Sequence, residues 1–250
     1  MPEGLALALQ TEGLVLLLLV LLLAGLVYGF AGFGAALIFI PLASIFVAPQ
    51  LAVGIMAVSA LGSTVTVLPR AWRQADRARV LWMLVPAFLT LVPGIWLLRS
   101  MDVLPLRWLI SGLIVLSLAA MTLGWRRSMA PNRAALAAVG GAAGFIGGLT
   151  GLTGPVVILF NLSGDEPVVI TRANTLCFLT LLGVLMIPQL AAQGVITGPV
   201  LWLGLLATPV YMVGTAIGQA VFNPAYQSVY RLLGYGVIAG AVLVGLPLWD

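Results

Sequence analysis

The second half of this chain contains, inside a long apolar run, the stretch Gly144-Phe-Ile-Gly-Gly-Leu-Thr-Gly-Leu-Thr-Gly-Pro155. The first half has a shorter counterpart, Gly29-Phe-Ala-Gly-Phe-Gly34, which is followed by Pro41. Glycine and proline both weaken a helix, and between Thr150 and Pro155 they occur in close order. The sequence therefore predicts that neither run is one continuous straight helix.

Such breaks have a particular meaning inside a lipid bilayer. Irregular backbone is tolerated there only where protein buries it or where it lines a cavity. Broken segments at matching places in two halves indicate the substrate site of a transporter. A plainer explanation applies to part of the second stretch, because Gly140, Gly144 and Gly148 recur every four residues, the pattern that lets transmembrane helices pack closely.

The composition indicates an integral membrane protein. Of the 250 residues, 62% are hydrophobic and 7% are charged, whereas soluble domains carry about 25% charged residues. A membrane-spanning helix needs roughly 20 apolar residues, so we expect an all-α, polytopic transmembrane helix bundle of about eight segments. Residues 14–28 are interpreted as a retained first helix, because no basic region precedes them. The apolar runs cover about residues 14–48, 51–69, 80–98, 108–124, 134–160, 167–188, 199–218 and 229–248.

The arginines predict the orientation. Seven of the 11 basic residues lie in two segments, 70–79 and 126–133. These segments are two crossings apart and therefore on one side, which the positive-inside bias makes the cytoplasmic side of the inner membrane. The N-terminus is cytoplasmic if the first run crosses once, and outside if that run crosses and fully returns. Because the arginines border spans, they do not form a nucleic-acid surface.

The chain divides into two similar halves, residues 1–128 and 129–250. Each consists of a glycine-broken run followed by three spans, and the segment 125–133 joins them. The motif beginning at Gly29 matches the one beginning at Gly144. Internal duplication is common in transporters, so we expect two four-segment transmembrane repeats that form one membrane domain.

With this order of motifs the chain resembles the sulfite exporter TauE/SafE family, also called the toluene sulfonate uptake permeases. The resemblance extends over essentially the whole chain. It rests on the first glycine-rich run ending at Pro41, the span 52–66, the arginine segment 70–79, and the block 148–161 followed by Arg172-Ala-Asn-Thr175. It implies a membrane permease for sulfite or an organosulfonate-type anion.

The sequence offers few residues that could carry catalysis. The chain has no histidine, which excludes Ser-His hydrolysis and histidine-based zinc chemistry. Its acidic residues lie near the chain ends or in loops, and the adjacent Asp165 and Glu166 are expected to be solvated. The single cysteine, Cys177, excludes an intrachain disulfide and is expected to pack in the core. We therefore expect no enzymatic activity, no metal and no cofactor.

The candidate substrate site combines backbone donors at both breaks with polar side chains. A half-helix beginning near Pro155 would point free N–H groups inward, which suits an anion. Arg172 would add a guanidinium able to form two parallel hydrogen bonds, or it would instead anchor the chain at the lipid interface. Ser59, Ser63, Thr64 and Asn161 would be neutral donors, although each alone more often joins helices. The candidate substrate-binding residues are Gly29, Gly32, Gly34, Ser59, Gly148, Gly151, Thr153, Gly154, Pro155, Asn161, Arg172, Asn174 and Thr175.

We therefore expect a transporter whose partners are a small anionic substrate and the lipid bilayer. Sulfite, thiosulfate, sulfoacetate and other small organic anions all fit a site built from backbone amides. The main alternative is a non-transporting membrane scaffold or biogenesis factor whose glycines only pack helices. An intramembrane enzyme is the third possibility. A cavity that reaches both glycine breaks would favour transport, and a solid bundle there would favour the scaffold.

Overall fold

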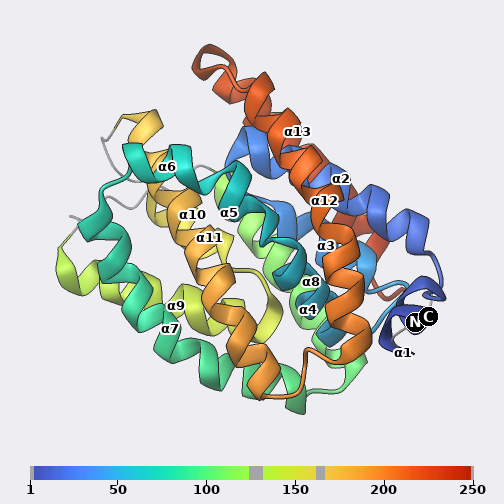
Figure 1. Cartoon of the computed structure of the whole chain (residues 1–250). Coiled ribbons are helices and arrows are strands. Elements are labelled where there is room, and N and C mark those ends of the chain that lie inside the picture. Colours follow the sequence, from blue (N-terminus) through green and yellow to red (C-terminus); the bar gives the residue numbers. More distant parts are fainter. Residues whose placement is uncertain (1–2, 124–131, 162–166, 249–250) are drawn as a thin grey trace.

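The computed structural model describes residues 3–123, 132–161 and 167–248, and every element in these ranges is helical (Figure 1). This confirms the expected all-α class. The junction at 124–131 and the acidic pair Asp165 and Glu166 lie outside the described residues. The elements are α1 (Glu3–Leu9), α2 (Leu14–Ala31), α3 (Ala35–Ala43), α4 (Pro49–Ser59), α5 (Gly62–Thr66), α6 (Leu68–Gln74), α7 (Arg77–Ser100), α8 (Val103–Thr122), α9 (Arg133–Thr150), α10 (Gly154–Asn161), α11 (Val168–Ala192), α12 (Gly198–Val221), η1 (Pro224–Tyr226) and α13 (Gln227–Gly245).

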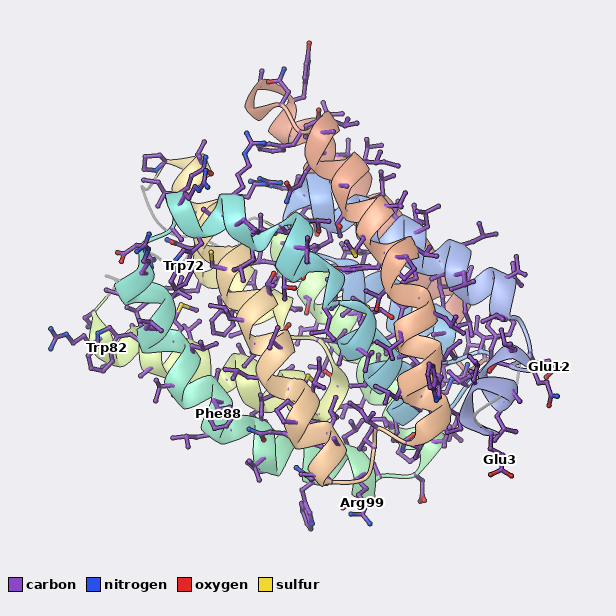
Figure 2. The ribbon with its side chains drawn as sticks, viewed as in Figure 1. Glu3, Glu12, Trp72, Trp82, Phe88 and Arg99 are labelled. Carbon is purple, nitrogen blue, oxygen red and sulfur yellow. The ribbon has the colours of Figure 1, made fainter. Side chains whose placement is uncertain are left out.

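Within the described ranges, 8 helical segments are long and apolar enough to cross a membrane. They are Leu14–Ala31, Pro49–Thr66, Arg77–Ser100, Val103–Thr122, Arg133–Thr150, Val169–Ala192, Gly198–Val221 and Ser228–Gly245. Their outer faces carry large apolar side chains; Trp82 and Phe88, for example, project outward from α7 (Figure 2). Such an extensive exposed apolar surface is stable against lipid and not against water. The chain is a multi-pass membrane protein.

Both glycine-rich runs are interrupted in the structure. α2 ends at Ala31, and Gly32 and Gly34 adopt left-handed backbone angles, with φ of 85° and 97°, before α3 begins. In the second half α9 ends at Thr150, and Gly151 has φ of 76° before α10 begins. A residue with a side chain would lose roughly 1–2 kcal/mol in this conformation. Glycine therefore allows the backbone to change direction at these positions.

The arginine-containing segment 70–79 forms the end of α6, a short connection and the first turn of α7, and it marks one side of the bundle. We call this side the arginine side. α2 and the α4–α5 span both run parallel to α12, since residue numbers rise together along their contacts. The contacts are Gly25 with Tyr211, Gly29 with Gly218, Gly54 with Val200 and Gly62 with Met212. Because α2 and α4 are parallel, α3 carries the chain back between them.

The second half contains an equivalent return. α9 and α11 both run parallel to α7, so α10 carries the chain back between them (Figure 1). For α9, Gly140 contacts Met83 and Gly148 contacts Leu91. For α11, the side-chain amide of Gln189 donates to the carbonyl of Phe88 at 3.1 Å, and that of Gln193 donates to the carbonyl of Val92 at 3.2 Å. The structure thus contains two hairpins, α2–α3 and α9–α10.

The two hairpins enter from opposite sides. α4–α6 ends on the arginine side, so the parallel helix α2 also ends there and begins on the opposite side. α7 begins on the arginine side, as does the parallel helix α9. Of the two alternatives that the sequence left open, the structure thus has the first run crossing the bundle and returning.

Close backbone contacts hold each hairpin against the other half. A Cβ atom on Gly140 would lie 2.0 Å from the carbonyl oxygen of Met83, and one on Gly144 would lie 2.1 Å from that of Ala87. No side chain fits at such distances, so these glycines allow α9 to pack directly on α7. The equivalent contact in the first half joins α2 to α12.

Candidate functional site

A cavity of about 80 Å³ is lined by residues from the tips of both hairpins. The first half contributes Tyr28 and residues 34–37, and the second half contributes residues 151–154. Residues of α4, α5, α11 and α12, together with Ala60, complete the wall. One water molecule needs roughly 10–15 Å³ measured in this way, so the cavity has room for a small anion or several waters. The bundle is not solid between the breaks.

Two short helices begin at the wall of this cavity. Ala35, Ala36 and Leu37 form the first turn of α3, and the residue before them, Gly34, provides no side-chain cap. The first N–H groups of a helix have no partner inside the helix, and the helix start carries about half a positive elementary charge. α10 presents Gly154 to the same cavity. Both breaks therefore direct positive helix ends toward one space.

Hydroxyl groups supply further donors. The Tyr28 hydroxyl lies 3.0 Å from the Thr180 hydroxyl, and Ser63 donates to Thr180 at 3.4 Å. All three side chains line the cavity, together with Tyr211, whose ring centroid is 6.2 Å from that of Tyr28. Each hydroxyl can both donate and accept. The lining of the described cavity contains no charged side chain, so an anion would meet only neutral donors and helix ends.

The predicted residues that the structure brings together are Gly34, Gly151, Thr153 and Gly154. Two observations show that position 151 requires glycine. Its φ is positive, and a Cβ there would lie 2.4 Å from the Ile40 side chain. Gly154 is different. A Cβ there would make only ordinary contacts, the nearest at 3.5 Å, and Pro155, which follows it, does not itself line the cavity.

Three other predicted residues join helices and lie outside the cavity lining. A Cβ on Gly29 would be 2.5 Å from the Thr215 carbonyl oxygen, and one on Gly148 would be 2.7 Å from the Leu91 carbonyl oxygen. Ser59 donates to the carbonyls of its own helix and of Gly204, the latter at 3.2 Å. These contacts correspond to the plain packing role that the sequence left open. The side chain of Asn161 lies outside the described residues.

Arg172, Asn174 and Thr175 lie in the first two turns of α11, away from the cavity lining. Asn174 accepts the backbone N–H of Asp76 at 2.7 Å, which fixes the connection between α6 and α7. Thr175 donates to the carbonyl of Thr171 at 2.9 Å in its own helix. These two side chains therefore have structural partners.

The Arg172 side chain points into the protein and not toward lipid. Its guanidinium lies 3.9 Å from the centroid of the Phe222 ring and donates to the carbonyl of Gly29. Gly32 packs against its aliphatic part, since a Cβ there would be 3.2 Å from Arg172 Cγ. Arg172 thus contacts the first break from its arginine side, while Gly34 faces the central cavity.

Sequence reasoning missed Tyr28, Thr180 and Tyr211 as lining residues. Tyr28 precedes Gly29 directly, and Thr180 is a polar residue within an apolar span, which are the signals that would have pointed to both. Cys177 is buried and unpaired. The described residues contain no group of three or more His, Cys, Asp or Glu side chains placed to hold a metal ion.

Comparison with known proteins agrees with this architecture. The family model for the sulfite exporter TauE/SafE matches residues 17–245. Neither the curated proteins nor the solved structures include a match to this chain. The match includes residues of both hairpins and of all eight spans, and the chain belongs to the sulfite exporter TauE/SafE family of membrane transporters.

Proposed function

We propose that this protein carries small sulfur oxyanions, such as sulfite or an organosulfonate, across the inner membrane, and that it binds them in the cavity between the two breaks. The family supports sulfur-anion transport. The observation that carries the proposed site is the single cavity reached by the starts of both α3 and α10. A scaffold whose glycines only pack helices has no need for such a space.

The chemistry of the wall suits an oxyanion. A hydrogen bond to a charged group is worth about 1.5–3 kcal/mol, and a helix start adds about 0.3–1 kcal/mol. The N–H groups of α3 and the hydroxyls of Tyr28 and Thr180 would replace part of the hydration shell of the anion. Because no fixed positive side chain lines the cavity, the anion would be bound and yet remain free to leave.

The arrangement of the halves supports alternating access. We propose that residues 1–128 and 129–250 are repeats of opposite orientation, with α2 on α12 equivalent to α9 on α7. In transporters with inverted repeats, one part rocks against the other around a fixed site near the midplane. The two hairpins, entering from opposite sides, would open the cavity to each side in turn.

Transport by the purified protein in proteoliposomes tests this proposal. Saturable uptake of at least one anion from a panel of sulfite, thiosulfate and sulfoacetate is expected. Gly154→Val should abolish uptake while the protein stays folded, since it adds bulk beside the cavity where a Cβ meets only ordinary contacts. Gly112→Val is the matched control, because a Cβ there has no neighbour within 4 Å. Absence of saturable uptake for the whole panel would reject the function.

A further inference from the structure

A second polar pocket lies on the arginine side of the first break, formed by α6, the start of α11 and the end of α12. Its polar and aromatic lining consists of Arg70, Gln74, Arg172, Gln219 and Phe222. No residue lines both this pocket and the central cavity. The pocket is therefore separate from the central cavity.

The charge of this pocket is not balanced. Arg70 and Arg172 both face it, and none of the lining residues is acidic. In addition, the Nε of Arg172 is buried without a hydrogen-bond partner among the described residues. Two like charges repel, and a buried donor without a partner destabilises the protein. A bound anion would remove both penalties.

We propose that this pocket is a second anion site, which binds a doubly charged oxyanion between Arg70 and Arg172. Guanidinium groups recognise sulfate- and phosphate-like oxygens through paired hydrogen bonds, and the amides of Gln74 and Gln219 add neutral donors. The same chemistry fits a free divalent sulfur oxyanion and the phosphate of an acidic lipid. If the proposed function holds, the free anion is the transported substrate on its way to or from the cavity.

Binding at this site would change the contact between the two halves. The pocket has a volume of about 10 Å³ in this structure, which is room for about one water molecule. Movement of the Arg172 guanidinium away from the Gly29 carbonyl that it now contacts would make room for an oxyanion. The anion replaces that carbonyl as the partner of Arg172. Occupancy of the site thus releases α11 from the end of α2, next to the break that faces the central cavity.

The test measures anion binding to the full-length protein in nanodiscs of neutral phosphatidylcholine, by calorimetry. Sulfate is the divalent probe and nitrate the monovalent one. Arg70→Ala is expected to weaken sulfate binding at one site roughly ten- to hundredfold, with a smaller effect on nitrate. Arg73→Ala is the matched control, because it removes the same charge from the same helix and does not line the pocket. Equal sulfate binding by both variants would overturn the proposal.

Two further experiments are needed. One distinguishes a free anion from a lipid phosphate as the ligand, and the other tests the second site independently of the proposed function. Sulfate could bind only weakly while phosphatidic acid, added to the discs, binds to the protein and no longer binds to Arg70→Ala. In that case the site is supported and its ligand is a lipid phosphate. If neither anion binds in an Arg70-dependent manner, the site is refuted. Gly154→Val disables the central cavity, so Arg70-dependent sulfate binding that persists in this variant supports the second site even if no uptake is observed.

Discussion

Replacement of Ala36 by proline removes a single backbone donor from the central cavity. Ala36 is the second residue of α3 and lines the cavity. Proline has no N–H but fits the first turn of a helix. The chain already has a proline at this position of α6, α10 and α12, namely Pro69, Pro155 and Pro199. We therefore expect Ala36→Pro to fold with α3 intact.

The expected loss follows from the value of one charge-assisted hydrogen bond. Such a bond contributes about 1.5–3 kcal/mol, and each 1.4 kcal/mol is about tenfold in affinity. The sulfite concentration for half-maximal uptake should therefore rise roughly ten- to hundredfold in Ala36→Pro. Ala36→Val is the matched control, because valine and proline add the same number of carbon atoms to alanine but valine keeps the N–H.

The assay is initial-rate uptake of labelled sulfite into proteoliposomes, normalised to folded protein. Thermal unfolding of each variant, followed by circular dichroism, verifies that the helices are intact. The valine variant should require much less sulfite than the proline variant for half-maximal uptake. If the two variants give the same value and both are folded, the N–H of residue 36 does not contact the anion, and the reasoning from helix starts is wrong.

Three further predictions concern the cavity, the packing and the orientation. Tyr28→Phe removes one hydrogen bond to the anion and should raise the half-saturating sulfite concentration roughly ten- to hundredfold, measured by uptake; an unchanged value would exclude this hydroxyl from binding. Gly144→Ala should lower the midpoint temperature of unfolding markedly, because its Cβ would lie 2.1 Å from a carbonyl oxygen of α7. The control Gly112→Ala should leave the midpoint unchanged, and equal midpoints for the two variants would contradict the close packing. A single cysteine at Gln74 in a cysteine-free background should be labelled only from the cytoplasm; labelling of intact cells by an impermeant reagent would invert the orientation.

The helical fold and the place of the breaks could be predicted because both depend on local composition. Apolar runs of sufficient length specify membrane helices wherever they occur. Glycine with a positive φ ends a helix whatever surrounds it. Gly34 and Gly151 both have positive φ between two helices, and they line one cavity together with Gly154, the first residue of α10.

The side chains around the cavity could not be predicted in the same way. Arg172 and Thr180 lie on the same helix, about two turns apart, and only Thr180 lines the cavity. Which of them does so depends on how α11 is positioned along α2, which is a tertiary property. Similarly, Gly148 and Gly154 are alike in sequence, yet one packs against α7 and the other faces the cavity. A glycine that lets another helix pack closely and a glycine that lines a cavity cannot be distinguished from the neighbouring sequence.

The position of a bound anion tests the central claim most directly. Selenite is a chemical analogue of sulfite, and its selenium can be located in crystals by anomalous scattering. We predict an anomalous peak in the cavity between Gly34 and Gly154, within hydrogen-bonding distance of the first-turn N–H groups of α3 and of the Tyr28 hydroxyl. A peak confined to the pocket of Arg70 and Arg172, or no peak in protein that takes up selenite, would contradict the account.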